Sequence, residues 1–408
     1  MKLESRLKLL VLCQLFYPEL ISTGQTLTEL CEELAGMGVK IEVLCGPPTL
    51  VDQKGKIEKT INYKGITINR VFSTRFPKLN LFGRISNQVT YALSTFRRLI
   101  FDRSQRPILV VTNPPFLAFF CALLGRKFIY LIHDVYPDTA VKLGLIKPNG
   151  LLARIWDRLN AFTYSRAARI IVIGRCMQEI IQRNVPSQKN KVKMIHVWSN
   201  DKLIGQAAGK NNPFIERWGL KDKFVVGYSG NMGWFHDMET IMQAADQLQA
   251  QKDLVFLFIG EGHKKRWMID YTQKRGMTNC QFHSYVKREE LGLALACSQL
   301  GLASLLSEQV GLSVPSKIFG FMAAGVPIIG VLPSSSEAAL VISEEKCGLV
   351  VRPGDAAGLA AAILRLKGDP EARAVMAKNA RQAIAQKYSL HWAAAAYYAI
   401  ISDLNEDS

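Results

Sequence analysis

Apolar runs of strand length alternate with helical stretches along the whole chain of 408 residues. The run Leu7–Cys13 is apolar without a break, as is typical of a strand buried on both faces of a parallel sheet. Apolar residues then recur at helical spacing from Leu27 to Met37, and this helix is expected to end at Gly38. Repetition of the unit predicts parallel sheets covered by helices on both faces. Further strands are expected at Lys40–Cys45, Ile66–Val71, Ile108–Thr112, Phe128–Ile132, Arg169–Ile173, Val192–Trp198, Phe224–Tyr228, Leu254–Ile259, Asn279–Tyr285, Leu300–Ala303, Val326–Val331 and Gly348–Val351.

A chain of this length is expected to form two domains. The polar, turn-rich segment Ser199–Leu220 separates two similar series of strands and is interpreted as the linker. We therefore predict an α/β fold of two doubly wound, Rossmann-like domains that face each other across a cleft, with ligands at the carboxyl ends of the strands. The expected limits are 1–200 for the first domain and 201–387 for the second, and a helix over about 388–408 is expected to pack back on the first.

Positive charge is concentrated in the first half of the chain. Residues 1–200 hold 29 Lys and Arg against 13 Asp and Glu, and Lys59–Phe101 contains eight basic residues and no acidic one. This concentration of positive charge favours binding to a polyanionic surface. The apolar residues that lie between the basic ones favour partial insertion into an anionic membrane. A solvated basic face is the alternative, and nucleic acid is not expected as a partner because no binding module is recognisable. The apolar residues are Phe72, Phe76, Leu79, Leu81, Phe82, Ile85, Tyr91 and Phe96.

No apolar run reaches the length of a membrane-spanning helix, and no signal peptide is evident. The eight cysteines are scattered singly without a C-x-x-C pair, so we expect buried thiols rather than a zinc or redox site. The expected location is the cytoplasm, with peripheral attachment to the inner face of the plasma membrane.

The segment Val314–Ile329 combines a helix start, a glycine turn and a strand. Pro315, Ser316 and Lys317 stand where the helical pattern begins, and Gly325 ends it. A helix start provides free backbone N–H groups, to which Ser316 and Lys317 add a hydroxyl and a cation, so the segment suits a phosphate group. An ordinary capped helix followed by a tight turn is the alternative.

Two glycine turns in the same half follow expected strands. Glycine allows backbone amides to approach a bulky anion, and a lysine pair after the second turn can neutralise a diphosphate. Neither turn matches G-x-G-x-x-G or the P-loop pattern, which disfavours nicotinamide and ATP. Plain turns and a solvated lysine pair are the alternatives. We expect the diphosphate at Gly230, Asn231, Gly233, Lys264, Lys265, Ser316 and Lys317.

Two other strand ends carry candidate chemistry. The end of Asn279–Tyr285 can present its backbone to a nucleobase edge, although a plain core strand is the alternative; the nucleobase and ribose are assigned to Gly260, Glu261, Tyr285 and Val286. In the first half, His133 and Asp134 end an apolar strand, where open α/β sheets place their ligands. There His133 is expected to titrate near neutral pH and Asp134 to accept a substrate hydroxyl, unless the pair is a structural turn. No partner cluster for a metal is apparent.

Further short motifs extend the pattern along nearly the whole chain: Phe16–Glu19, Thr23-Gly24, Leu34–Val43, Tyr228–Gly233, Ile259–Gly262, Pro315–Lys317, Met322–Pro327 and Cys347–Asp355. In this order and spacing they resemble the retaining family 4 glycosyltransferases of the GT-B fold. The likeness is greater to the bacterial branch that builds O-antigen and exopolysaccharide, which includes fucosamine transferases.

The resemblance implies a retaining hexosyl-type transferase that moves a sugar from a nucleotide-diphosphate-sugar to a lipid-linked glycan at the membrane, without a metal or other cofactor. On this basis His133, Asp134 and Lys317 are expected to be catalytic, and Thr23 and Gly24 to form the acceptor loop. The donor sugar is expected beside Glu308, Leu312 and Ser313.

One departure from the family pattern concerns its glutamate pair, of which the first usually contacts the donor sugar and the second the ribose. Leu312 and Gly320 stand at these positions, and Glu308 or Glu337 could substitute. A non-catalytic GT-B subunit of a polysaccharide assembly complex therefore stays open as an alternative. A sugar-nucleotide epimerase is another alternative, against which the basic stretch without acidic residues argues.

Overall fold

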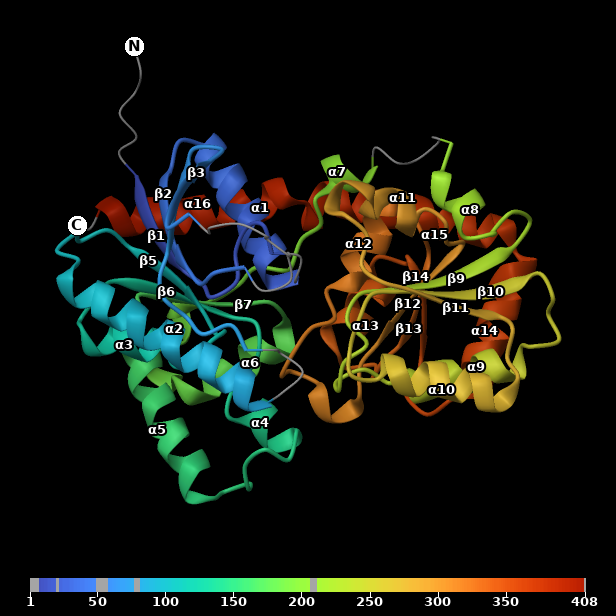
Figure 1. Ribbon diagram of the computed structural model, residues 1–408, viewed down its shortest axis with the longest axis horizontal. Helices are drawn as coiled ribbons and strands as arrows, with labels where there is room; N and C mark the ends of the chain where they lie inside the picture. The colour runs from blue at the N-terminus through green and yellow to red at the C-terminus, as the bar shows by residue number, and fades with distance from the viewer. Residues whose placement is uncertain (1–6, 20–21, 49–57, 77–80, 206–210, 407–408) are drawn as a thin grey trace, which may run out of the picture. The chain divides into compact units, whose positions relative to one another are not determined.

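The computed structural model describes residues 7–19, 22–48, 58–76, 81–205 and 211–406 (Figure 1). The chain divides into two compact units. Unit 1 comprises residues 1–196 and 390–408, and unit 2 comprises residues 197–389. Each unit is a mixed α/β structure built on a parallel sheet, which confirms the predicted fold class.

The sheet of unit 1 has eight strands in the order β3-β4-β2-β1-β5-β6-β7-β8. All neighbours pair in parallel except β3, which is antiparallel to β4 and was not predicted. Its four residues alternate between exposed and half-buried positions, so they lack the apolar run that identified the other strands. The strands are β1 (Lys8–Leu12), β2 (Lys40–Cys45), β3 (Thr60–Tyr63), β4 (Ile66–Arg70), β5 (Ile108–Val111), β6 (Phe128–Ile132), β7 (Arg169–Val172) and β8 (Val192–Met194).

The helices of unit 1 form two groups. Across the sheet, the chain moves from β1 to β2 in one direction and from β4 through β7 in the other. Because connections between parallel strands are right-handed, α1 lies on one face of the sheet and α2, α3 and α5 lie on the other face. The C-terminal helix α16 packs on α1 (Figure 1). The helices are α1 (Ser22–Gly36), α2 (Leu81–Phe101), α3 (Leu117–Leu123), α4 (Asp138–Lys142), α5 (Leu151–Arg166), α6 (Arg175–Asn184) and α16 (Leu390–Glu406), with a 3-10 turn at Pro186–Lys191.

The sheet of unit 2 has six parallel strands in the order β11-β10-β9-β12-β13-β14. Alternate residues of the inner strand β10 join two different apolar clusters: Phe256 and Phe258 belong to one, and Val255 and Leu257 to the other. The sheet is therefore buried on both faces. Its strands are β9 (Phe224–Ser229), β10 (Leu254–Ile259), β11 (Cys280–His283), β12 (Leu300–Ser304), β13 (Ile328–Val331) and β14 (Gly348–Val351).

Two short helices, α7 (Asp201–Gly205) and α8 (Pro213–Arg217), lie within the segment Ser199–Leu220 that was interpreted as the linker. Asn212 caps α8 by accepting a hydrogen bond from the Phe214 amide, and Phe214 is buried in the core. The helices of unit 2 are α7 (Asp201–Gly205), α8 (Pro213–Arg217), α9 (Met238–Gln247), α10 (Lys265–Arg275), α11 (Leu291–Leu295), α12 (Lys317–Ala324), α13 (Glu337–Glu344), α14 (Ala356–Gly368) and α15 (Pro370–Ala383). Short 3-10 turns lie at Arg288–Glu290 and Ser307–Gln309, and a π-helical turn at Ile384–Tyr388.

Among the described residues no helix is both long and apolar enough to cross a membrane. The cysteines are all free, and six of them are buried, whereas Cys176 and Cys280 are half-buried.

Helix α12 packs against the sheet at unusually short range. A Cβ atom added at Gly301 of β12 would lie 2.4 Å from the Phe321 ring of α12. Phe321 itself is buried. The glycine therefore sets the height of α12 above the sheet, and with it the place of Lys317 at the start of the helix.

We expect Gly301→Ala to destabilise unit 2 by about 1–3 kcal/mol, because the added methyl group must displace the ring. Urea denaturation followed by circular dichroism measures this. Gly368→Ala is the matched control, since a Cβ there meets nothing within 4 Å. Equal stability of the two variants would contradict the account.

Candidate functional site

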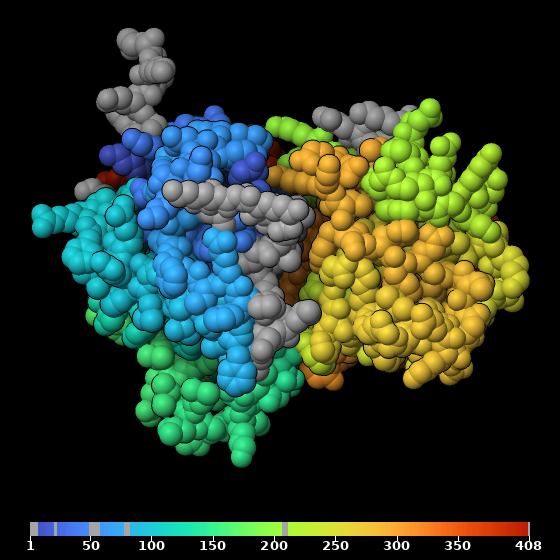
Figure 2. Space-filling view, in the orientation of Figure 1, coloured from blue at the N-terminus to red at the C-terminus, as the bar shows by residue number. Residues whose placement is uncertain are grey.

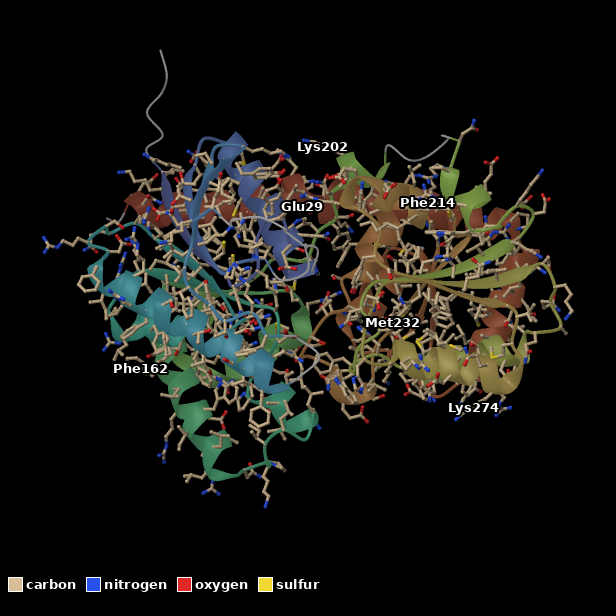
Figure 3. The ribbon with its side chains drawn as sticks, viewed as in Figure 1. Glu29, Phe162, Lys202, Phe214, Met232 and Lys274 are labelled. Atoms are coloured by element: carbon tan, nitrogen blue, oxygen red, sulfur yellow. The ribbon has the colours of Figure 1, made fainter. Side chains whose placement is uncertain are left out.

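Loops at the carboxyl ends of β9, β10 and β12 are joined by backbone hydrogen bonds. The Met232 amide donates to the Glu261 carbonyl (2.8 Å), and the Lys264 amide donates to the Met232 carbonyl (2.9 Å). On the other side, the Leu306 amide donates to the Phe235 carbonyl (2.9 Å). Met232, labelled in Figure 3, therefore belongs to a connected group of turns at one edge of the sheet.

Close contact between two of these turns explains their glycines. Gly260 and Gly262 have φ values of 138° and 154°. A Cβ at Gly260 would lie 2.1 Å from the Gly230 carbonyl oxygen, and one at Gly262 would lie 2.4 Å from that of Met232. Backbone packing is thus sufficient to require glycine at both positions. The glycines do not by themselves indicate a ligand.

Several backbone N–H groups beside these turns are available to a ligand. Within the described part of the chain, the amides of Asn231 and Gly233 have no hydrogen-bond acceptor. Ser316 is the N-cap residue of α12, but its side chain makes no capping bond, and the first amides of a helix have no acceptor within the helix. A Cβ at Gly230 would lie 3.5 Å from Cε of Lys317, so the lysine side chain passes the first glycine turn. The structure therefore brings the two predicted phosphate motifs together.

The ammonium group of Lys317 contacts two aromatic side chains. Its Nζ lies 2.5 Å from the Tyr228 hydroxyl and 4.3 Å from the centre of the Tyr228 ring. It also lies 3.3 Å from Nε2 of His236. No carboxylate among the described residues is within ion-pair distance of Lys317. Among the described residues, the site therefore holds a basic group without a carboxylate counterion.

Burial lowers the pKa of Lys317 to about 7, from an ordinary value of 10.5. The charged form of this lysine therefore lowers the stability of the fold, because a buried ammonium without an anion loses its hydration. A lysine with a pKa near neutrality, next to free backbone amides, is a candidate for a functional site.

Sequence analysis missed Tyr228 and His236 as neighbours of Lys317. Tyr228 stood in an expected strand and His236 in no predicted motif, and the contacts join residues 89 and 81 positions apart. A local sequence motif cannot predict contacts between residues that are so far apart in the chain.

The lysine pair expected at the diphosphate is used inside the protein. Lys264 donates to the carboxylate of Glu239 (2.8 Å). Lys265 donates to the carboxylate of Glu261 (2.7 Å) and to the Gly260 carbonyl (2.8 Å). Carboxylates therefore compensate both charges in the structure, and the assignment of the two lysines to the diphosphate stays a prediction.

The four residues assigned to nucleobase and ribose lie at the ends of β10 and β11. A Cβ at Gly260 would be 3.3 Å from the Tyr285 ring, and Tyr285 is 39% exposed. Burial opposes ionisation of Glu261, but hydrogen bonds from Lys265 and Ser284 outweigh it and lower the pKa of Glu261. Val286 instead packs against the apolar cluster around Phe214, so its side chain is part of the core.

The residues assigned to the donor sugar follow β12. Leu312 is buried, Ser313 is half-buried, and Glu308 is exposed in a 3-10 turn. The amides of Leu312 and Ser313 both donate to the Gln309 carbonyl, which fixes this turn. The side chain at position 312 is thus an apolar contact, and the carboxylate of Glu308 faces solvent.

His133 and Asp134 belong to unit 1, at the end of β6. Both backbone amides approach the Thr112 hydroxyl, at 3.1 and 3.4 Å. Burial lowers the pKa of His133 to about 4 and raises that of Asp134 to about 6. His133 is therefore neutral near pH 7, and the expectation that it titrates there is wrong. Asp134 is the group of the pair with a pKa near neutrality.

Thr23 and Gly24 lie in the first turn of α1, so the expectation that they form a loop is corrected. A Cβ at Gly24 would lie 3.3 Å from Cβ of Glu19 and 3.4 Å from the Leu15 carbonyl group. Gly24 thus allows the helix to pack against the segment after β1.

The amphipathic basic stretch forms a strand pair and α2, which lies at the surface of unit 1 (Figure 2). Tyr91 was expected among its exposed apolar residues, but it is buried and donates to the Leu44 carbonyl (2.8 Å). Phe96 packs on Phe120. Lys78 and Leu79 lie outside the described residues. Exposed apolar side chains follow one stripe of the helix at spacings of three, four and seven: Phe82, Ile85, Val89, Leu93 and Ile100.

Among the described residues, no group of three or more His, Cys, Asp or Glu side chains lies close enough to hold a metal ion.

Comparison with known protein families gives two matches that together include most of the chain. A family described as "Glycosyl transferase 4-like domain" matches residues 23–198. A family described as "Glycosyl transferases group 1" matches residues 211–383.

Two curated relatives and one solved structure are similar over most of their length. "Probable glycosyltransferase WbjE" of Pseudomonas aeruginosa is 32% identical over 299 residues, which are 70% of this chain and 73% of the relative. "Putative colanic acid biosynthesis glycosyl transferase WcaI" of Escherichia coli is 25% identical, over 78% of this chain and 82% of the relative. The structure of HepE from Anabaena in complex with UDP and glucose has a TM-score of 0.74 at 14% identity, over 97% of this chain and all of that one.

We expect Lys317→Met to raise the melting temperature while it removes anion binding, because methionine avoids the cost of burying the ammonium. The folded pKa lies below the unfolded one, so the cost is fully present below about pH 7 and vanishes as the pH rises toward about 10.5. The free energy of unfolding of Lys317→Met should exceed that of the wild type by on the order of a few kcal/mol at about pH 6, and the difference should be near zero at about pH 10. Differential scanning calorimetry in buffers without phosphate measures it. A lower melting temperature at about pH 6 would show that the lysine stabilises the fold.

Proposed function

Because the chain belongs to the glycosyltransferases of the GT-B fold, we propose that it moves a sugar from a nucleotide-diphosphate-sugar to a lipid-linked glycan at a membrane. The reaction would serve cell-surface polysaccharide biosynthesis. The observation that carries the proposal is Lys317, an ammonium without a carboxylate partner among the described residues, beside free backbone amides. The relative WcaI, named for colanic acid biosynthesis, supports the choice of pathway, and the UDP complex of HepE supports the class of donor.

In the proposed reaction, the bond between the anomeric carbon and the diphosphate oxygen breaks, and the nucleoside diphosphate leaves with the electron pair. Lys317 and the amides of Asn231 and Gly233 stabilise the negative charge that develops on that oxygen. Ser316 adds a hydroxyl donor. We propose that these groups replace a divalent cation, and that the anomeric configuration is retained, as the family resemblance implies.

The acceptor hydroxyl oxygen bonds to the anomeric carbon and releases its proton to a base. Within unit 1, we propose Asp134 as the residue that binds an acceptor hydroxyl, because its pKa of about 6 leaves it largely ionised at about pH 7. His133, neutral at this pH, is a hydrogen-bonding contact rather than a proton acceptor.

The acceptor is proposed to stay in the bilayer while unit 1 rests on the anionic headgroups. The helix α2 has no acidic residue, and its exposed stripe includes Phe82, which is 83% exposed. Exposed Arg84, Arg97 and Arg98 belong to the same helix, and exposed Arg75 precedes it. Apolar insertion and about 1 kcal/mol for each basic residue near the surface are sufficient for reversible attachment.

A non-catalytic GT-B subunit is the second candidate, since Leu312 and Gly320 stand in place of the family glutamates. Leu312 is buried and cannot contact a sugar hydroxyl by a hydrogen bond from its side chain. This candidate predicts nucleotide binding without turnover on any acceptor.

A panel of UDP- and GDP-sugars, tested with membranes that contain lipid-linked glycans, tests the proposed reaction. We expect release of a nucleoside diphosphate with one donor, and a loss of about 100-fold or more in kcat for Lys317→Met. Circular dichroism checks that the variant is folded. Epimerised donor would support the epimerase instead, and unchanged turnover in Lys317→Met would refute the role of this lysine.

Replacing Arg75, Arg84, Arg97 and Arg98 by Gln should weaken binding to vesicles rich in phosphatidylglycerol by about 1,000-fold, because each residue contributes about 1 kcal/mol. A sedimentation assay at low salt measures the effect. The matched control removes the same charge from exposed positions of unit 2: Lys221, Lys252, Lys274 and Arg365. Equal retention of both variants on vesicles would exclude α2 as the docking surface.

A further inference from the structure

His236 is held in one tautomer by the backbone of β12. Its Nδ1 lies 2.7 Å from the Ser304 carbonyl oxygen, which can only accept a hydrogen bond. Burial and the charges of Lys317 and Lys264, only partly opposed by this hydrogen bond, lower the pKa of His236 to about 3. The ring is therefore neutral at about pH 7, with its proton on Nδ1 and a lone pair on Nε2.

The ammonium group that Tyr228 contacts lies almost equally far from the two ring nitrogens of His236, at 3.3 Å from Nε2 and 3.4 Å from Nδ1. Because Nδ1 carries the proton, Nε2 is the ring nitrogen that can accept a hydrogen bond from Lys317. The Tyr228 hydroxyl donates its own hydrogen to the Asn231 carbonyl (3.0 Å), so its oxygen accepts from Lys317. An ammonium group has three hydrogens, and these two acceptors use two of them. The third hydrogen has no acceptor among the described residues.

The charged and titratable groups around Lys317 come from three loops. Lys264 is already paired with Glu239, and Tyr285 approaches Tyr228 from the loop after β11. None of them brings a negative charge to the lysine at about pH 7. A second cation at position 236 would repel Lys317, whereas a neutral imidazole accepts its hydrogen bond and also excludes water.

We propose that His236 is the positioning residue of the diphosphate site: as a neutral acceptor it directs Lys317 so that one ammonium hydrogen is left for a diphosphate oxygen. This inference rests on the proposed function, because it takes the ligand to be a nucleoside diphosphate. It adds a role for a residue outside every motif that the sequence indicated.

Two substitutions separate an acceptor role from a purely spatial one. His236→Phe keeps a flat ring of similar size but has no acceptor, whereas His236→Gln keeps an acceptor without the ring. If the acceptor matters, the Phe variant should bind UDP or GDP about tenfold or more weakly at about pH 7.5, and the Gln variant should recover most of the affinity. If His236 only fills space, the order of the two variants reverses. His391→Phe, on α16 of unit 1, controls for the loss of a histidine.

The pH profile gives a readout that a purely spatial role would not move. Since Lys317 binds the diphosphate as an ammonium, affinity should fall as the pH rises above about 7 in the wild-type protein. The Phe variant removes an acceptor that stabilises the ammonium, so the pKa of Lys317 decreases and the fall begins at lower pH. The Gln variant should follow the wild type.

Calorimetric titrations with UDP and GDP between about pH 6 and 9 measure both effects. The pKa of Lys317 is measured separately, without nucleotide, from the 13C shift of its ε-carbon, which Lys317→Met identifies by its absence. Wild-type protein that binds neither nucleotide would overturn the diphosphate role together with the proposed function. Nucleotide binding with the same pH profile and the same lysine pKa in wild type and His236→Phe would overturn only the role of His236.

Discussion

The cost of keeping an ammonium group away from both water and carboxylates shapes unit 2 around Lys317. The Tyr228 ring and hydroxyl offset part of that cost, and the lowered pKa of the lysine shows that the rest is not recovered within the described residues. An arriving diphosphate removes the remainder, because it supplies the missing negative charge. Its binding then gains from an interaction that the free protein leaves unsatisfied.

Close packing keeps the lysine in this costly position. A flexible side chain would turn toward solvent if its helix could move, but Phe321 fixes α12 over Gly301 at a distance that no side chain at position 301 would allow. The carboxylates that could neutralise the site are themselves engaged: Glu239 with Lys264 and Glu261 with Lys265. The turns are thus stabilised by paired charges, while one cation is left free for a ligand. In unit 1 the positive charge lies at the surface instead, where α2 combines it with exposed apolar side chains.

The sequence predicts the strands well where burial on both faces makes them continuously apolar. The strands Phe128–Ile132 and Leu254–Ile259, which are buried at every residue, have the predicted limits. The strand β3 was not predicted because its residues alternate between exposed and half-buried positions and form no apolar run. On α2, the apolar pattern alone could not show that Tyr91 faces the core while Phe82 faces solvent.

At the candidate site, sequence analysis identified the segments but not the partners. Lys317 and the turn at Gly230 lie together as expected. The ion pairs of Lys264 with Glu239 and of Lys265 with Glu261 were not predicted, because they depend on loop packing that the sequence pattern does not show. Likewise, burial sets the pKa of His133 and Lys317 far from ordinary values, and burial is a property of the fold.

Comparison of nucleoside and nucleoside diphosphate binding by isothermal titration calorimetry tests the central claim most directly. The account predicts that UDP or GDP binds at least about tenfold more tightly than its nucleoside at about pH 6.5, and that this difference disappears in Lys317→Met. Equal affinity for nucleoside and diphosphate in the wild-type protein would show that the uncompensated lysine is not a diphosphate site.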